Sequence, residues 1–282
     1  MKNDYKKLVK EYSNLIKNHY NTENLELTLP QISNSKKSIM IFSPHPDDEC
    51  IIGALPLMAR FQCHRVYNVI ITQGSNKARQ AERLIEVTNA CNYLGFEPVR
   101  LKENGLNNVN LKCRETDLQN WNSNIQEICN CFQKYQPEII LVPHAHDWNS
   151  SHIGTHHLIL DAIQQINWSG LLFFTEYWGA MTNPNLMLEV SEEILAELMH
   201  ALTFHVGEVS RNPYHLGLPA WMQDNVRRGA EIVGGQGMEA PKFLFATLYR
   251  LANMQNGNIL NTDFKKIITK NDNLQLNLFN LN

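Results

Sequence analysis

The sequence lacks the features that mark several large classes of protein. No apolar run approaches the ~18 residues needed to span a bilayer. The first residues, MKNDYKKLVKEYSNLIKN, contain no apolar core of a signal peptide. The net charge is -3, so no strongly basic excess indicates nucleic acid as a partner. We therefore expect a cytoplasmic protein that binds neither membranes nor nucleic acid.

Paired cysteines and glycine fingerprints are also missing. The six cysteines form no CxxC pair and no regular framework, which favours free thiols over disulfides. The run Gly234-Gly235-Gln236-Gly237 lacks GxGxxG spacing and follows a predicted helix, and neither a P-loop nor a Gly-x-Ser-x-Gly elbow is present. A nucleotide-binding Rossmann enzyme is therefore only a distant alternative.

What the sequence does contain is an alternation of strands and helices in an ordinary globular composition, with 43% hydrophobic and 19% charged residues. Short apolar runs rich in β-branched residues predict strands over 38–44, 66–72, 99–101, 138–143 and 171–177. Helical periodicity predicts helices over 4–18, 49–60, 77–94, 116–135 and 153–166. This order predicts an α/β fold, Rossmann-like, whose mainly parallel sheet carries helices on both faces. After Leu195 we expect a helix, a Gly/Pro-rich stretch (207–240) and an apolar segment (242–250).

Two polar clusters follow predicted strands. The first runs from Ser43 to Glu49 and the second from Pro143 to His152. Ligands of open α/β sheets bind at the carboxyl ends of the strands, so both clusters belong to one edge. Carboxylate oxygen together with imidazole nitrogen suits a divalent ion such as Zn²⁺, with another divalent metal as the alternative. Of the adjacent Asp47 and Asp48, one can hold the ion while the other faces a water, and spacing alone leaves open which does which.

The motifs also resemble a known family. Pro44-His45-Pro46-Asp47-Asp48-Glu49 resembles the signature of the PIG-L/LmbE-type zinc-dependent N-deacetylases, which include GlcNAc deacetylases. Further similarities are Thr72-Gln73-Gly74, the Arg83, Glu86, Ala90 and Leu94-Gly95 pattern, His152 followed by Thr155, and, weakly, His205 with Arg228 and Glu231.

The resemblance implies a set of roles. His45, Asp48 and His152 would be zinc ligands, Asp47 the general base, and Arg83 a contact to polar groups of the substrate. That substrate would be a small N-acetylated amino sugar, and the family often forms homo-oligomers. The chain would then divide into an N-terminal helical extension (1–36), an LmbE-like deacetylase domain (37–251) and a C-terminal appendage (252–282).

Two departures from the family pattern lie beside the third ligand. Ser151 replaces the usual aspartate, and Asn149 replaces a histidine that aids the oxyanion in many members. Asn149 can donate a hydrogen bond but cannot shuttle a proton. We therefore assign it a catalytic role as a hydrogen-bond donor only. His144 or His146 could ligate the metal or fill the missing role; both rank below His152, and His146 is assigned to the substrate.

Other side chains near the two clusters have several uses. His156 lies one helical turn beyond His152 and is a less favoured ligand, and Asp147 could orient an imidazole. Glu176-Tyr177-Trp178 could line a sugar pocket or pack in the core. The stretch after residue 207 could form a lid or a subunit contact through Tyr214, His215, Trp221, Arg227 and Arg228.

The functional hypothesis is hydrolysis of an N-acyl amide, in which Asp47 deprotonates a metal-activated water. Because Asn149 and Ser151 depart from the family, a carbohydrate-binding module without turnover is the main alternative. A two-metal phosphoesterase is disfavoured because the two loops contain few carboxylates.

Overall fold

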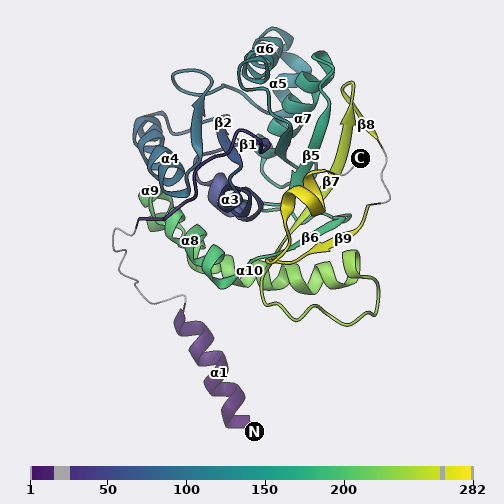
Figure 1. Ribbon diagram of the computed structural model, residues 1–282. Helices are drawn as coiled ribbons and strands as arrows, with labels where there is room; N and C mark the ends of the chain where they lie inside the picture. The colour runs from purple at the N-terminus through teal and green to yellow at the C-terminus, as the bar shows by residue number, and fades with distance from the viewer. Residues whose placement is uncertain (1, 16–25, 261–263, 281–282) are drawn as a thin grey trace.

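The computed structural model describes residues 2–15, 26–260 and 264–280, and nine strands of this part form one sheet. Their order is β3-β2-β1-β4-β5-β7-β6-β9, and β8 pairs with β7 (Figure 1). The strands are β1 (Ser38–Ser43), β2 (Arg65–Ile70), β3 (Glu97–Arg100), β4 (Ile139–Pro143), β5 (Gly170–Thr175), β6 (Leu186–Glu189), β7 (Ala246–Gln255), β8 (Asn258–Leu260) and β9 (Lys266–Ile268). The first five strands along the sheet, β3 to β5, are parallel, and β7 is antiparallel to β5 and β6. The predicted mainly parallel α/β sheet is confirmed.

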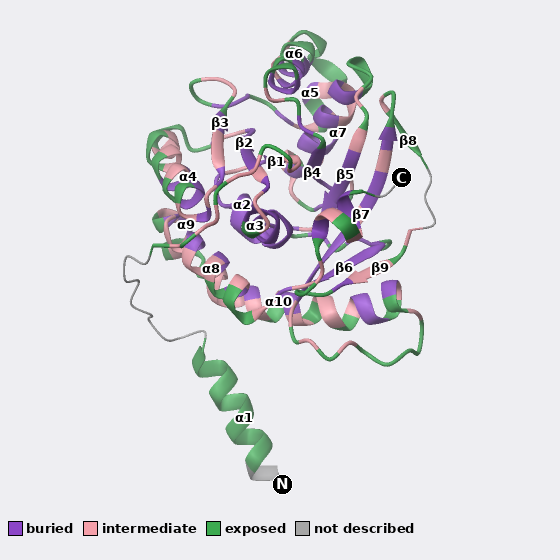
Figure 2. Cartoon of the chain, viewed as in Figure 1, coloured by how far each residue is buried: buried purple, intermediate pink, exposed green. Residues whose placement is uncertain are grey.

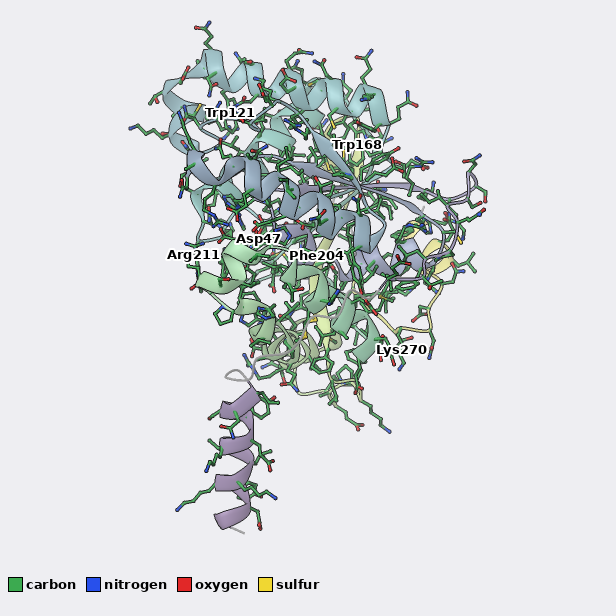
Figure 3. All side chains as sticks on the ribbon, turned by 90° about the vertical axis from the view of Figure 1, so that its left-hand side faces the viewer. Asp47, Trp121, Trp168, Phe204, Arg211 and Lys270 are labelled. Carbon is green, nitrogen blue, oxygen red and sulfur yellow. The ribbon has the colours of Figure 1, made fainter. Side chains whose placement is uncertain are left out.

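Helices cover both faces of the sheet (Figure 2). Successive side chains of β1 point to opposite faces, so they are buried in two different core clusters. Ile39 and Ile41 pack in a cluster with α2 (Asp48–Ile51), α3 (Ala54–Phe61), α4 (Gln80–Leu94), α8 (Glu192–Thr203) and α10 (Tyr214–Gly229). Met40 and Phe42 pack in a second cluster with α5 (Leu111–Thr116), α6 (Leu118–Tyr135) and α7 (Ser150–Gln165). Trp121 and Trp168, labelled in Figure 3, belong to this second side.

The helices expected over 49–60 and 116–135 are among those that differ in the structure. The helix expected over 49–60 is divided into α2 and α3 at Gly53, where a Cβ atom would lie 2.4 Å from the carbonyl oxygen of Glu49. The helix expected over 116–135 begins at Leu118, because Asp117 caps it through the backbone N–H of Asn120. Its predecessor α5 was not predicted.

The Gly/Pro-rich stretch 207–240 is largely helical, against the sequence-based expectation. It contains most of α9 (Val206–Arg211), the 16 residues of α10, and a π-helical turn over Ala230–Gly234. Leu218 and Met222 lie one turn apart on α10 and are buried. The packing of this face overrides the low helix propensity of its glycines and of Pro219, which α10 contains.

The apolar segment 242–250 leads into β7, a central strand between β5 and β6. Beyond residue 251 the chain completes β7, adds β8 and β9, and places Leu274, Leu278 and Phe279 in the larger core cluster. The division of the chain into domains stays a prediction, but β7 crosses the boundary expected at 251, and the expected appendage contributes to sheet and core.

Helix α1 (Lys2–Leu15) projects away from the body of the molecule and does not pack on the sheet (Figure 1). It confirms the predicted helix as far as Leu15, and residues 16–18 of that prediction lie outside the described residues. Its apolar side chains Tyr5, Leu8, Val9 and Tyr12 are exposed. Among the described helices, none combines the length and hydrophobicity needed to span a bilayer.

Candidate metal centre

The two polar clusters meet at the carboxyl edge of the sheet, as the sequence predicts. β1 and β4 are hydrogen-bonded parallel neighbours, so their final residues lie side by side. His45 lies in the loop that follows β1, and His152 lies in the first turn of α7, which follows β4. This helix starts at Ser150 rather than at 153 because Asn149 caps it: its side-chain oxygen accepts the N–H of Ser151 at 2.9 Å.

Three side chains converge on one point. His45 Nδ1 lies 3.2 Å from His152 Nε2, and Asp48 Oδ2 lies 3.4 Å from His45 Nδ1 and 3.3 Å from His152 Nε2. A tetrahedral ion with ligand bonds of about 2.0–2.2 Å places its donor atoms about 3.3–3.6 Å apart. The donor set and its spacing therefore fit a divalent ion such as Zn²⁺ with one position left for water or substrate.

A second carboxylate faces the buried candidate ligand His152. Asp147 Oδ1 lies 3.5 Å from His152 Nδ1, the nitrogen that faces away from the three-donor point. The carboxylate itself is fixed by the backbone N–H groups of Asn149 (2.9 Å), Trp178 (3.1 Å) and Gly179 (3.2 Å). Metal-binding histidines almost always donate their other ring N–H to such a partner. Asp147 is therefore placed next to His152, and its role in orienting the imidazole stays a prediction.

The electrostatics of the centre favour positive charge. Burial lowers the pKa of His152, but Asp48 and Asp147 outweigh burial and raise this pKa to about 10. Burial likewise raises the pKa of Asp48, but the two histidines reverse that effect and lower it. An ion bound by neutral imidazoles and an ionised Asp48 would supply the positive charge that the carboxylates stabilise.

Asp47 lies next to this point but outside the group of three donors. Its backbone has φ 113°, a region that non-glycine residues rarely adopt, and its N–H donates to Glu49 Oε2 at 3.0 Å. Tyr214 donates its hydroxyl to Asp47 Oδ2 at 2.6 Å, and Arg83 Nη2 lies 3.7 Å from the same oxygen. Burial and the nearby charge of Asp48 raise the pKa of Asp47 to about 7. Spacing alone left the two aspartates interchangeable, and the resemblance implied Asp48 as the ligand. The structure brings Asp48 to the histidines and turns Asp47 toward Tyr214.

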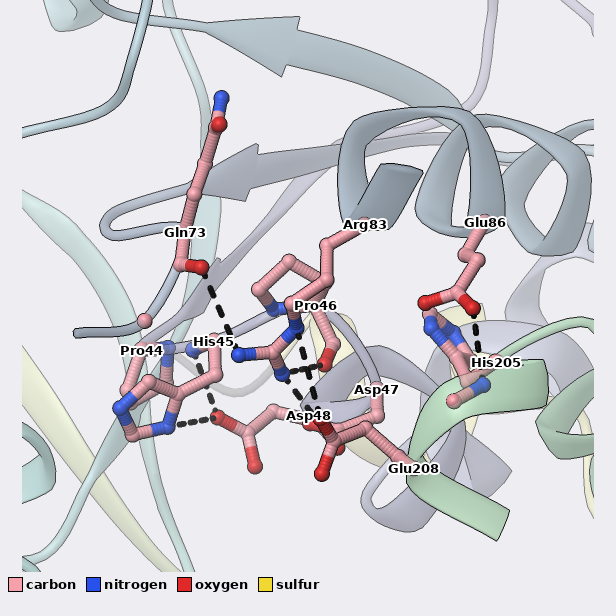
Figure 4. A network of polar contacts seen from close by, with 12 residues as sticks. Pro44, His45, Pro46, Asp47, Asp48, Gln73, Arg83, Glu86, His205 and Glu208 are labelled. Atoms are coloured by element: carbon pink, nitrogen blue, oxygen red, sulfur yellow. Dashed lines mark hydrogen bonds and ion pairs between the residues drawn. The ribbon is translucent and has the colours of Figure 1, made fainter. Parts of the chain in front are cut away.

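Arg83 reaches from α4 to the loop that carries the ligands (Figure 4). Its Nη2 donates to the carbonyl oxygen of Pro46 at 2.8 Å, and its Nη1 lies 3.5 Å from the carbonyl oxygen of Gln73. Gly74 has φ +80°, and a Cβ atom there would lie 2.3 Å from Arg83 Nη1. The Thr-x-Gly turn thus leaves room for this arginine, whose contact with substrate stays a prediction.

The other predicted histidines lie outside the three-donor group found among the described residues. His144 Nε2 is 2.7 Å from the carbonyl oxygen of Gly179, and His156 Nδ1 is 2.8 Å from that of Pro143. Both are committed to loop contacts, so the structure supports neither as a ligand. His146 is exposed, and its contact with substrate stays a prediction.

The sequence analysis did not identify the ion pairs that Glu49 and Glu208 form next to the site. Glu49 Oε1 lies 2.7 Å from His205 Nε2, and both side chains are fully buried. Glu208 Oε1 accepts from Arg79 Nη1 at 2.9 Å and lies 3.8 Å from Arg83 Nε. These contacts join α9 to residues more than a hundred positions earlier, so only the weak family similarity at His205 could have indicated them. Cys50 completes a second candidate group, but the direct hydrogen bond between Glu49 and His205 leaves no space for an ion between them.

The fold and site thus define an α/β protein with a candidate divalent-metal centre at the carboxyl edge of its sheet. The family described as PIG-L: GlcNAc-PI de-N-acetylase matches residues 40–163, a range that includes all three candidate ligands. The PIG-L family model therefore matches this part of the chain, and the resemblance noted in the sequence is confirmed.

Solved structures share this fold at low sequence identity. N,N′-diacetylchitobiose deacetylase from Pyrococcus horikoshii has a TM-score of 0.56 at 13% identity, over 90% of this chain and 93% of its own. Teicoplanin deacetylase Orf2, in a zinc-inhibited form, has a TM-score of 0.55 at 14% identity, over 77% and 98%. The 4-carboxy-2-hydroxymuconate hydratase GalB from Pseudomonas putida KT2440 has 0.57 at 15%, over 77% and 96%. No curated protein matches the chain in sequence.

Proposed function

We propose that the protein is a metal-dependent hydrolase that removes an N-acetyl or other N-acyl group from an amino sugar or its conjugate. One observation carries this proposal: His45, Asp48 and His152 form a three-donor triangle of 3.2–3.4 Å within the range that matches the PIG-L family. Because the fold is shared with a hydratase as well as with deacetylases, the proposal depends on the site and the family match rather than on the fold.

His45, Asp48 and His152 would hold the ion, with Zn²⁺ as the proposed metal. When bound there, a divalent ion would lower the pKa of water from 15.7 to about 7 and polarise the amide carbonyl. Asp47 is the proposed general base, because its carboxylate is next to the ligands without being one of them. Tyr214 occupies Oδ2 of this carboxylate and thereby leaves Oδ1 to accept a proton from the attacking water.

The departing amine needs a proton, and Asp47 can return the one it has taken. Asn149 is proposed to donate a hydrogen bond through its side-chain NH₂, since its side-chain oxygen already caps α7. Arg83 and His146 are proposed to contact polar groups of the substrate. The contacts of Arg83 with Pro46 and Gln73 use only some of its N–H donors, so Arg83 can hold the ligand loop and contact a substrate at the same time.

An amino sugar is the proposed substrate because two kinds of similarity agree. The family description names a GlcNAc-containing substrate, and one structure of the same fold is a deacetylase of N,N′-diacetylchitobiose. Cytoplasmic location and homo-oligomer formation stay predictions.

The proposal is tested by incubating the zinc-loaded protein with N-acetylglucosamine or N,N′-diacetylchitobiose and measuring free acetate and amine. Activity should disappear with a chelator and return with Zn²⁺. His152→Ala should lose both bound zinc and turnover. His157→Ala, on the same helix but outside the three-donor group, should keep both.

The alternative function is a carbohydrate-binding module without turnover. It is favoured if zinc and sugar bind but neither acetate nor amine is released. Release of amine that is unchanged in His152→Ala would refute the metal-dependent mechanism.

A further inference from the structure

A buried pair of side chains, Glu49 and His205, is connected to Asp47, the proposed general base. The two oxygens of the Glu49 carboxylate accept different hydrogen bonds. Oε2 accepts the backbone N–H of Asp47 at 3.0 Å, and Oε1 lies 2.7 Å from His205 Nε2. An ionised carboxylate only accepts, so the imidazole donates from Nε2. None of the roles proposed above uses this connection between His205 and Asp47.

The backbone of Asp47 needs contacts of this kind. Its φ of 113° is a conformation that costs a non-glycine residue free energy and that persists only where the surrounding structure holds it. Asp47 is the N-cap of α2, but its side chain forms no capping hydrogen bond. The peptide between Pro46 and Asp47 is instead held at both of its polar atoms. Its carbonyl oxygen accepts from Arg83 at 2.8 Å, and its N–H donates to Glu49.

His205 holds the Glu49 carboxylate in place. Both side chains are fully buried, so water cannot replace a lost partner. The Cys50 thiol, 3.4 Å from Oε1, is only a weak donor. A buried carboxylate that loses its partner must find another donor, and a rearranged Glu49 no longer offers its oxygen to the N–H of Asp47. His205 is the N-cap of α9, 156 positions along the chain, so it fixes Glu49 from outside α2.

The candidate ligand Asp48 does not depend on this pair. Its Oδ2 accepts the backbone N–H of His45 at 2.8 Å and lies 3.4 Å from His45 Nδ1 and 3.3 Å from His152 Nε2. Release of the Asp47 backbone should therefore move the carboxylate of the base and leave the three donor atoms in place.

We infer that His205 is a positioning residue, which through Glu49 holds Asp47 in the conformation that separates the base from the neighbouring ligand Asp48. The inference rests on the proposed function and adds to it a residue that touches neither substrate nor metal. A pair that only stabilises the fold is the alternative, and it predicts a loss of stability without a selective loss of kcat.

His205→Leu tests the inference, because leucine fills much of the same volume and removes the donor. In the zinc-loaded variant, kcat for N-acetylglucosamine or N,N′-diacetylchitobiose should fall by about 5- to 150-fold, the population ratio that corresponds to one strained backbone conformation. KM and zinc content should stay unchanged, since the three-donor group keeps its position. His205→Gln keeps a side-chain N–H donor and should restore kcat to within about twofold of the unmodified protein.

Two comparisons separate positioning from stability. His64→Leu is the matched control, because His64 is also fully buried and hydrogen-bonded but directly precedes β2, at the opposite edge of the parallel strands. It should lower the free energy of unfolding in urea and leave kcat unchanged. In the Asp47→Asn protein, His205→Leu should cause no further loss of kcat, because His205 acts only through Asp47.

Crystal structures test the positioning role independently of turnover. In His205→Leu, the φ of Asp47 should become negative and the hydrogen bond from Tyr214 should be lost, while the three candidate ligands superpose on those of the unmodified protein. If the unmodified protein releases no amine but these changes occur, the proposed hydrolase fails and the positioning role stands.

The positioning role is overturned, with the hydrolase intact, by any of four results. These are equal losses of kcat in His205→Leu and His64→Leu, zinc content that falls together with kcat, losses from His205→Leu and Asp47→Asn that multiply, or a positive φ that persists at Asp47. Glu49→Gln replaces His205→Leu if that variant does not fold. One of the two N–H groups then faces an amide NH₂ instead of an oxygen, so kcat should fall to a similar extent, and an unchanged kcat overturns the role as well.

Discussion

Tyr214, on α10, donates its hydroxyl to Oδ2 of Asp47 at 2.6 Å, across 167 positions of sequence. The phenol therefore fixes the carboxylate that we propose as general base. It also links the C-terminal helices to the loop after β1, so the base is positioned by an element outside the 40–163 range that matches the family.

Tyr214→Phe should lower turnover by roughly tenfold or more with little change in KM. A hydrogen bond to a charged group contributes about 1.5–3 kcal/mol, and without it the Asp47 carboxylate is free to rotate away from the attacking water. Steady-state kinetics on an N-acetylated amino sugar measure the effect. Zinc content should be unchanged, because the hydroxyl of Tyr214 donates to Asp47, which is not one of the three proposed ligands.

Tyr93→Phe is the matched control for this prediction. Tyr93 also donates its hydroxyl to a carboxylate, that of Glu197. It lies near the C-terminal end of α4, whereas Arg83, which contacts the ligand loop, lies near the start of this helix. Its removal should leave kinetics unchanged. Equal losses in the two variants would mean that Tyr214 acts on stability rather than on Asp47.

Asp47→Asn should retain zinc and lose turnover by about 10²–10⁴-fold, the usual contribution of a general base. Asparagine tolerates a positive φ better than most residues, so the local backbone at φ 113° should survive the change. Metal analysis and an amine-release assay on the same sample check both parts. Turnover close to that of the unmodified protein would assign the base to another residue.

Asp147→Asn should weaken zinc binding by about 10–100-fold, because Asp147 orients the His152 ring without touching the ion. Competition with a zinc chelator of known affinity measures this. Asp161→Asn is the control, since Asp161 pairs with Arg114 on the other side of α7. An unchanged affinity in Asp147→Asn would show that backbone packing alone holds the imidazole.

The sequence was sufficient for the features that depend on local pattern. Strands β1 and β4 are short apolar runs, and the polar residues just after each one had to meet once the strands were parallel neighbours. The same reasoning could not separate Asp47 from Asp48, because their difference comes from a positive φ at Asp47 and a contact with distant Tyr214.

Features that depend on long-range packing could not be predicted. Helix α10 forms in a stretch rich in glycine and proline because Leu218 and Met222 are buried against the core. β7 is inserted antiparallel between β5 and β6, an arrangement that strand periodicity does not specify. The pairing of Glu49 with His205 depends on the same distant elements.

The stability of the fold should fall as the pH decreases from about 6.5 to 4, partly through His64. This side chain is fully buried, its Nδ1 accepts the backbone N–H of Lys37 at 3.1 Å, and burial lowers its pKa to about 4. Between that value and the unfolded pKa of about 6.5, the unfolded chain binds a proton that the folded chain excludes, so stability rises with pH in this window. The contribution is up to about 3 kcal/mol of unfolding free energy.

His64→Asn should flatten this dependence, because asparagine keeps an acceptor for the N–H of Lys37 but does not titrate. Urea unfolding at several pH values between 4 and 7 gives the free energy of unfolding for both proteins. Some slope should remain, since burial also lowers the pKa of His156 to about 4. Parallel curves for the two proteins would show that protonation of His64 is not coupled to folding.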